Sequence, residues 1–347
     1  MSERPGNQLF DAYFTARDMR EVFCDAGRVQ AMLDVEAALA RAEARVGLIP
    51  QDAVAPIENA CRAQLYDFSA LSDAIASAGN SAIPLVKALG KLIATESAEA
   101  ERYVHLGATS QDVMDSGLVL QLRQALGLIE AELAQLAGIL ARQAERYAAT
   151  PLAGRTWLQH ATPVTLGMKI AGWLGAITRS RQRLKELKPR LLVLQFGGAS
   201  GTLAALGEQA LPVAEALAAE LQLNLPEQPW HTQRDRLVEF GAVLGLIAGS
   251  LGKLGRDISL LMQTEAGEAF EPSAPGKGGS STMPHKRNPV GAAVLIGAST
   301  TSQALASPRR STPPRPPDCA CAAWWTNRPC PAPKARTLRR PRSASTS

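Results

Sequence analysis

The sequence is poor in residues that hold metals or cross-links: its 347 residues include five cysteines, four histidines and 5% aromatic residues. The cysteines show neither the spacing of a zinc site nor the density of a disulfide framework, and the histidines are scattered. The cysteines are Cys24, Cys61, Cys319, Cys321 and Cys330. We therefore expect no metal ion, no cofactor and no disulfide-stabilised fold.

Long apolar runs are also scarce. The first residues, Met1 to Asn7, contain no apolar segment of the kind that makes a secretory signal. The longest apolar stretch, residues 240–252, is shorter than the roughly 20 residues that cross a bilayer. We expect a cytoplasmic protein with no membrane partner.

Charge of one sign is in excess only near the C-terminus. The net charge is +5, but residues 303–347 hold nine Lys or Arg residues and one acid, Asp318. Residues 1–302 therefore carry a net charge of −3. A slightly acidic body gives no reason to expect a nucleic-acid partner.

Helical periodicity fills most of the body. From Leu122 to Leu140, apolar residues recur at alternating steps of four and three, and similar steps run from Leu237 to Leu261. We interpret Asp115-Ser116 as the cap of the first of these helices, and Gly79–Pro84 as a break. Helices are expected at about 29–46, 117–148, 164–188, 207–221, 237–261 and 289–305. This pattern predicts a bundle of long helices.

The chemistry-bearing residues gather in a glycine-rich stretch, Gly276–Pro289. Its three glycines let the backbone move and approach a ligand closely, and Ser280 and Lys286 follow them. Asn288 before Pro289 predicts a helix start, where backbone amides attract an anion. From composition alone, a solvated basic loop explains the stretch equally well.

Two polar clusters lie earlier, at His105–Asp112 and Gly154–Pro163. Thr109 and Ser110 in the first cluster can bind a carboxylate, but these residue types also begin helices. In the second cluster, an isolated His160 is more often structural than catalytic. Taken alone, both clusters favour a structural interpretation.

The segment Gly279-Ser-Ser-Thr-Met-Pro-His-Lys-Arg-Asn-Pro289 resembles the signature loop of the fumarase/aspartase superfamily. The two earlier clusters resemble the other two motifs of that superfamily in order and spacing, so the resemblance covers about residues 20–300. It implies an all-α, long-helix bundle with a small helical N-terminal domain (1–100) and a central bundle (101–302). It also implies an enzyme that makes or breaks a C–O or C–N bond beta to a carboxylate.

The resemblance assigns roles to motif residues. Ser280 matches the serine that exchanges the proton alpha to a carboxylate, and Lys286 and Asn288 match groups that, with helix-start amides, stabilise the aci-carboxylate. His160 is a further candidate for catalytic proton handling. Candidate binding residues for the substrate carboxylates are His105, Thr109, Ser110, Gln111, Thr156, Trp157, Gln159, Arg234 and Arg236.

Two departures favour one branch of the superfamily. Most members carry histidine where this chain has Trp157, and tend to carry glutamate where it has Ala293. The chain resembles the lactone-forming cycloisomerases of aromatic-compound catabolism, which add a tricarboxylate's own carboxylate across a double bond and release no separate leaving group. Residues 194–202 and 229–236 resemble the same branch. The alternatives are an adenylosuccinate-lyase-type enzyme, which shares Met-Pro-His-Lys-Arg-Asn-Pro, and a non-catalytic truncated relative.

Helix length bears on assembly. A helix over 117–148 would be roughly 48 Å long, at about 1.5 Å per residue. In one chain it keeps the cluster of Thr109 away from that of His160, so the two can meet only if different subunits supply them. This agrees with the homotetramer, with active sites shared between subunits, that the resemblance implies.

Residues 303–347 are rich in proline and arginine and lack apolar periodicity, so we expect no packed core there. One interpretation is a disordered basic extension. The other is an out-of-frame translation, because members of the superfamily continue into a further helical domain after the helix at 289–305. We favour the second, in which the C-terminal domain is missing.

Overall fold

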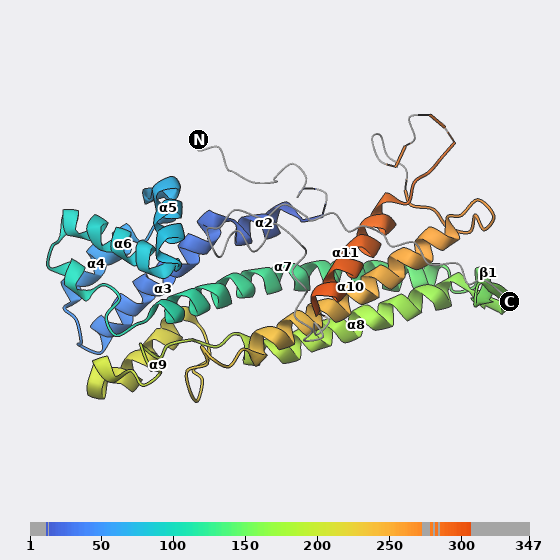
Figure 1. Cartoon of the computed structure of the whole chain (residues 1–347). Helices are drawn as coiled ribbons and strands as arrows, with labels where there is room; N and C mark the ends of the chain where they lie inside the picture. Colours follow the sequence, from blue (N-terminus) through green and yellow to red (C-terminus); the bar gives the residue numbers. More distant parts are fainter. Residues whose placement is uncertain (1–11, 13, 273–277, 280–281, 284, 307–347) are drawn as a thin grey trace, which may run out of the picture. The chain divides into compact units, whose positions relative to one another are not determined.

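A computed structural model describes residues 12, 14–272, 278–279, 282–283 and 285–306. Figure 1 shows mostly helices, together with a short hairpin of strands. The first half contains α2 (Arg17–Phe23), α3 (Asp25–Arg45), α4 (Val54–Ala60), α5 (Phe68–Ala78), α6 (Ala82–Glu96) and α7 (Ser110–Arg146). The second half contains β1 (Pro151–Thr156), β2 (Gln159–Thr165), α8 (Leu166–Leu191), α9 (Ala210–Leu221), α10 (Asp235–Leu261) and α11 (Val290–Ala306).

Helix α3 is the centre of a first apolar core. Its residues Leu33, Ala38 and Leu39 are at most 1% exposed, so the helix is buried on more than one face. Helix α4, the first turns of α7, and α9 pack with it, and α6 joins the same core through α4 and α7. The helix predicted around 29–46 is confirmed, with a start at Asp25.

The predicted break at Gly79–Pro84 is also confirmed. Helix α5 ends at Ala78, and Gly79 follows with a φ of +62°, a left-handed conformation that glycine adopts without a steric penalty. Helix α6 begins at Ala82 with Pro84 in its first turn, where the missing N–H of proline costs no hydrogen bond.

A second apolar core joins α7, α8 and α10, which run side by side in Figure 1. Leu126 on α7 and Leu184 and Leu187 on α8 are 0% exposed. Because burying one leucine contributes about 1.5–3 kcal/mol, such a seam is enough to hold long helices together. The stripe predicted from Leu122 to Leu140 is confirmed.

Helix α11 crosses α10 at close range (Figure 1). A Cβ built on Gly252 would lie 2.1 Å from Oγ of Ser299, and one built on Gly255 would lie 2.8 Å from the carbonyl oxygen of Ala292. Any side chain at these two glycines would therefore push α11 away from α10.

The two cores do not divide the chain at a single point. Residues 193–230, which include α9, pack in the first core although they follow α8 in sequence. The predicted domain boundaries at 100 and 302 stay predictions. Of the predicted tail, residues 307–347 lie outside the described residues.

Helix α7 begins earlier than predicted. Asp115 and Ser116, which we expected to cap it, are 3% and 0% exposed inside the helix. The N-cap is Thr109, in a capping box with Asp112, whose Oδ2 accepts from the Thr109 N–H at 3.0 Å. The cap was misplaced because Asp115 and Ser116 find polar partners in distant segments, which a local sequence pattern does not reveal.

The all-α prediction missed a β-hairpin. Strands β1 and β2 pair antiparallel, with Thr156 opposite Gln159, and the turn residues Trp157 and Leu158 have φ values of +50° and +62°. Positive φ at both turn positions matches the twist of the strands, but Asn-Gly or Asp-Gly normally supplies it. Because Trp-Leu is not a turn signal, the residue types did not predict the hairpin.

Two of the described helices, α7 and α10, are long and apolar enough to cross a membrane by length and composition alone. Helix α10 has an 18-residue window of mean hydropathy 1.6, because Leu237, Val238 and Leu254 extend the apolar stretch on both sides of 240–252. The expectation that no apolar stretch is long enough to cross a bilayer is therefore wrong by length and composition. Core helices of bundles meet the same criteria, and both helices contribute to the second core. The expected absence of a membrane partner stays a prediction.

The first core contains a buried acid. Glu43 on α3 is 0% exposed, and neither of its carboxyl oxygens has a hydrogen-bond partner in the part of the chain that the structure describes. Burial, reinforced by the charge of Glu36, raises the pKa of Glu43 to about 9. At neutral pH its carboxyl group is therefore protonated and uncharged.

The substitution Glu43→Gln should change how the free energy of unfolding depends on pH. A carboxyl whose pKa is 4.5 in the unfolded chain and about 9 in the folded chain binds its proton more tightly when folded. Its contribution to stability therefore falls as pH rises between these values, by up to about 1.4 kcal/mol per pH unit.

Glutamine does not titrate, so the variant should gain stability relative to the parent as pH rises from about 5 to about 9. Urea denaturation of both proteins across this range measures the difference. Parallel stability curves for the two proteins would contradict the prediction.

Candidate functional site

The first motif, His105–Asp112, lies at the N-terminus of α7. The Thr109 hydroxyl accepts from a backbone N–H of the first turn, so the capping interpretation of this residue is confirmed. Ser110 and Gln111 are the first helical residues and are half-buried. A substrate-binding role for these residues stays a prediction.

Asp112 fastens the first motif to a second segment of the chain. Its carboxylate accepts from the backbone N–H groups of Gly197 (3.0 Å), Gly198 (2.8 Å) and Thr109 (3.0 Å), and from Nε2 of Gln195 (2.9 Å). Burial raises the pKa of Asp112, and these four hydrogen bonds oppose that shift. A 1%-exposed carboxylate with four donors holds the two segments in one arrangement.

The same two segments touch through glycines. A Cβ on Gly198 would lie 2.9 Å from the Gly107 carbonyl oxygen, and one on Gly107 would lie 2.4 Å from the side chain of Leu206. Both glycines have positive φ, at +67° and +68°. The hydroxyl-bearing loop after Gly198 therefore lies directly beside the first motif, and its Ser200 and Thr202 hydroxyls are 3.1 Å apart.

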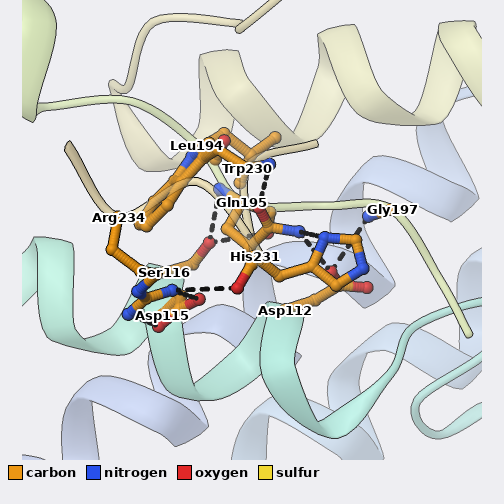
Figure 2. Close-up of polar contacts among 9 residues, drawn as sticks. All are labelled: Asp112, Asp115, Ser116, Leu194, Gln195, Gly197, Trp230, His231 and Arg234. Carbon is orange, nitrogen blue, oxygen red and sulfur yellow. Dashed lines mark hydrogen bonds and ion pairs between the residues drawn. The ribbon is translucent and has the colours of Figure 1, made fainter. Parts of the chain in front are cut away.

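Gln195 is the centre of the polar network in Figure 2. Its backbone carbonyl accepts from the Ser116 hydroxyl at 2.8 Å, and its backbone N–H donates to the same hydroxyl at 2.9 Å. Its side-chain Oε1 accepts from the backbone N–H of Trp230 at 2.6 Å. Nε2 of Gln195 lies 3.4 Å from Nδ1 of His231. The runs 194–202 and 229–236, which we had used only for the family resemblance, thus form one layer over the start of α7.

Arg234 is engaged within the protein. Its Nη1 and Nη2 donate to the carboxylate of Asp115 at 2.6 and 2.9 Å, and its guanidinium lies 5.3 Å from the centre of the Trp230 ring (Figure 2). Such a bidentate pair fixes the orientation of the guanidinium. Arg236 donates through Nη1 to the carbonyl oxygen of Arg190 at 2.8 Å. The predicted contacts of both arginines with substrate stay predictions.

The second motif forms the tip of the hairpin. Trp157 is 95% exposed at its turn, between Thr156 at the end of β1 and Gln159 at the start of β2. His160, the next residue of β2, is also exposed. These side chains therefore point away from the core of their own chain.

The signature loop is only partly described. Ser280, its predicted proton-transfer residue, lies outside the described residues. Asn288 N donates to the Gly278 carbonyl oxygen at 3.0 Å, and Asn288 Nδ2 lies 3.4 Å from the Gly279 carbonyl oxygen. The helix start predicted at Asn288–Pro289 is confirmed, because α11 begins at Val290. Asn288 is not its cap, because the N–H groups of Gly291 and Ala292 bond to another residue. Lys286 is exposed.

A carboxylate caps α11 instead. Glu271 accepts from the N–H groups of Gly291 at 3.0 Å and Ala292 at 2.7 Å. The helix start that we had predicted as an anion site is thus filled by a residue of the same chain. Arg287, whose guanidinium lies 5.4 Å from the centre of the Phe270 ring, adds a second contact across the base of the loop.

One chain does not bring the first two motifs together. Helix α7 has 37 residues and is about 55 Å long, with the first motif before it and the hairpin after it (Figure 1). Arg155 of the hairpin pairs with Glu268, in the segment that leads to the loop, at 2.6 Å. Arg155 lowers the pKa of Glu268. The hairpin is thereby joined to the segment after α10, whereas the pair of Asp115 and Arg234 joins the start of α10 to the first turns of α7.

Among the described residues, no three His, Cys, Asp or Glu side chains are placed to hold a metal ion. Four acids carry no signal in the sequence, although each bonds to a partner far along the chain or is buried in the core. These are Glu36, Glu43, Glu268 and Glu271. Glu271 follows Phe270 and precedes proline shortly before the loop, but nothing in its immediate surroundings signals a cap 20 residues away.

The sequence matches a family model described as Lyase over residues 12–303. Over 324 residues it is 73% identical to the 3-carboxy-cis,cis-muconate cycloisomerase of Pseudomonas aeruginosa PAO1, a match that covers 93% of this chain and 71% of that protein. It is 71% identical over 318 residues to the protein of the same name from Pseudomonas putida, covering 92% of this chain and 75% of that protein.

The fold is similar to the crystal structure of 3-carboxy-cis,cis-muconate lactonizing enzyme from Pseudomonas putida. The TM-score is 0.83 and the sequence identity is 75%, over 86% of this chain and 66% of that chain. This chain therefore spans about two thirds of the length of the solved enzyme. All three motifs lie inside the matched region 12–303.

Replacing Glu271 by alanine should destabilise α11 and the base of the loop. The variant leaves the N–H groups of Gly291 and Ala292 without their acceptor, and loss of an N-terminal cap costs about 0.5–2 kcal/mol. Urea denaturation measures the loss. Glu265→Ala, which removes an exposed glutamate six residues earlier, is the matched control. Equal stability of the two variants would contradict the capping role.

Proposed function

Because the chain belongs to the lyase family whose model matches residues 12–303, and its fold is fumarase/aspartase-like and mostly helical, we propose that it interconverts 3-carboxy-cis,cis-muconate and 4-carboxymuconolactone. The observation that supports this most directly is an identity above 70% to two pseudomonad cycloisomerases over more than nine tenths of this chain. The reaction belongs to the protocatechuate branch of the beta-ketoadipate pathway, in the cytoplasm.

The reaction is an intramolecular addition. In the direction of lactone formation, a carboxylate oxygen of the substrate bonds to one carbon of a C=C bond, and the electron pair moves to the other carbon, which is alpha to a carboxylate. The Ser280 hydroxyl gives its proton to that carbon. In the reverse direction, the Ser280 alkoxide removes the proton and the C–O bond breaks. No metal and no cofactor take part.

Lys286 and Asn288 stabilise the aci-carboxylate, in which negative charge gathers on two oxygens. Removing one such donor typically raises a barrier by about 3–4 kcal/mol. Lys286 also favours ionisation of the nearby serine. Since Glu271 already occupies the N–H groups of Gly291 and Ala292, we assign the stabilisation to the two side chains and not to the start of α11.

The remaining predicted residues bind the carboxylates of the substrate or help to move protons. They come from opposite ends of the long helices in one chain. The group at the start of α7 is His105, Thr109, Ser110 and Gln111, and the group on the hairpin is Thr156, Trp157, Gln159 and His160. Arg234 and Arg236 complete the set and act partly through their contacts with Asp115 and the backbone.

A homotetramer with shared sites brings these groups together. The most apolar 18-residue windows of α7 and α10 are each only 28% buried in one chain. Large side chains on the outer faces of the long helices are exposed, among them Met168 at 68%, Val238 at 67% and Leu246 at 54%. Exposed apolar side chains of this kind on long helices are what a second copy of the bundle would cover.

Purified protein should convert carboxymuconate and leave adenylosuccinate unchanged, as followed by ultraviolet absorbance. Ser280→Ala should reduce turnover by about 10²–10⁴-fold, the range that general acid–base catalysis contributes. Turnover of adenylosuccinate alone would refute the assignment. A Ser280→Ala protein with full activity would refute the serine's role and leave the substrate assignment standing.

The active protein should elute as a single species with four times the 36.8 kDa chain mass. Size-exclusion chromatography with light scattering measures this, and Leu246→Glu, on the exposed face of α10, should shift the protein to smaller species. A monomer with full turnover would contradict shared active sites. Aggregated, inactive protein would favour the interpretation of a non-catalytic truncated relative.

A further inference from the structure

A buried carboxylate of α3 lies against the first motif, and the mechanism above does not use it. The side chain of Glu36 is 1% exposed, and its Oε1 lies 2.7 Å from Nδ1 of His105, 69 positions later in the sequence. The His105 side chain is 20% exposed, so one edge of its ring meets a buried partner while part of it reaches the surface.

The backbone of His105 is held in a conformation that is uncommon for a residue with a Cβ. Its φ of +61° lies in the left-handed region. Non-glycine residues in this region gather at functional sites, where surrounding contacts hold them in place. The hydrogen bond to Glu36 is such a contact, and the tight packing of Gly107 against Leu206 is another.

The charged groups that face His105 favour its protonated form. Glu36 faces it from α3, and Asp112 faces it from the first turn of α7. Burial lowers the pKa of His105, but the hydrogen bond to Glu36 and the charges of Glu36 and Asp112 raise it further, and the pKa lies above its ordinary value. Glu43, two turns along α3 from Glu36, is uncharged at neutral pH.

The other ring nitrogen, Nε2, has no hydrogen-bond partner within the described part of the chain. We propose that Glu36 is a positioning residue, whose carboxylate accepts a hydrogen bond from Nδ1–H of the protonated His105 ring so that Nε2–H is left to donate to a carboxylate of the substrate. The inference rests on the proposed function, which makes the substrate a tricarboxylate. Glu36 acts through His105 and does not itself touch the substrate.

If Glu36 and His105 only stabilised the fold, their side chains would lie at the same distance of 2.7 Å. A measurement that packing alone does not change is therefore needed. With only four histidines in the chain, protein labelled at histidine 13Cε1 and 15N allows each ring to be followed by NMR, and His105→Asn assigns the His105 signal. Asparagine tolerates positive φ, so this variant removes the ring and keeps the backbone conformation.

In the parent protein, without substrate, the His105 ring should keep its Nδ1 proton and titrate above the ordinary histidine range. In Glu36→Gln its titration midpoint should fall by about one pH unit or more, the usual effect of removing a charge at this distance. Asp34→Asn, which neutralises an exposed acid on the same helix, should leave the midpoint unchanged. An unchanged midpoint in Glu36→Gln would overturn the proposal.

Kinetics give the second measurement. Glu36→Gln should raise KM for carboxymuconate about tenfold with a smaller change in kcat, and the loss should grow as pH rises through the new His105 midpoint. In the His105→Asn background the same substitution should have no further effect on KM. An equal effect in both backgrounds would show that Glu36 does not act through His105, and would overturn the proposal.

The two hypotheses fail separately. If the His105 titration shifts as expected but the parent protein does not turn over carboxymuconate, the proposed function is wrong and the pairing of Glu36 with His105 stands. If the parent turns over carboxymuconate and the titration does not respond to Glu36→Gln, the pairing is wrong and the function stands. Should Glu36→Gln fail to fold, the titration of His105 in the parent still decides, since an ordinary midpoint would overturn the proposal.

Discussion

The carboxylate of Asp112 is the contact on which the arrangement of this end of the molecule depends. It caps its own helix and at the same time accepts from three groups of residues 195–198, which follow the whole of α7, the hairpin and α8. Hydrogen bonds to this one buried carboxylate therefore hold the returning chain against the first motif, and α9, which follows in sequence, packs against α3. A charge at this position is tolerated because each of its oxygens has donors.

Apolar spacing was sufficient to predict the long helices. The steps from Leu122 to Leu140 and from Leu237 to Leu261 place one face of each helix in a common core, and the structure has both helices there. The errors arose where a local pattern competes with a distant partner. Ser116 has the residue type of a cap but bonds to Gln195, and the turn Trp157-Leu158 has the residue types of a core but adopts positive φ.

The candidate site is recognisable in the sequence as three motifs, but its contacts are not. The roles of Glu36 and Glu271 could not be predicted, because a glutamate on a helix or in a loop is usually solvated. Only the tertiary fold places Glu36 beside His105 and Glu271 at the start of α11. The buried acids are stabilised in different ways. Asp112 has four donors and Asp115 has an arginine, whereas Glu43 keeps its proton.

Helix α7 contributes Val113 and Val119 to the first core and Leu126 and Leu133 to the second. Each residue rotates an α-helix by about 100°, so one inserted residue between the two groups would turn the second set away from its partners. Seven residues restore the phase to within about 20° and lengthen the helix by about 10 Å. The separation of the two motifs is therefore constrained: an insertion in this helix keeps both sets of core contacts only if it adds about two whole turns.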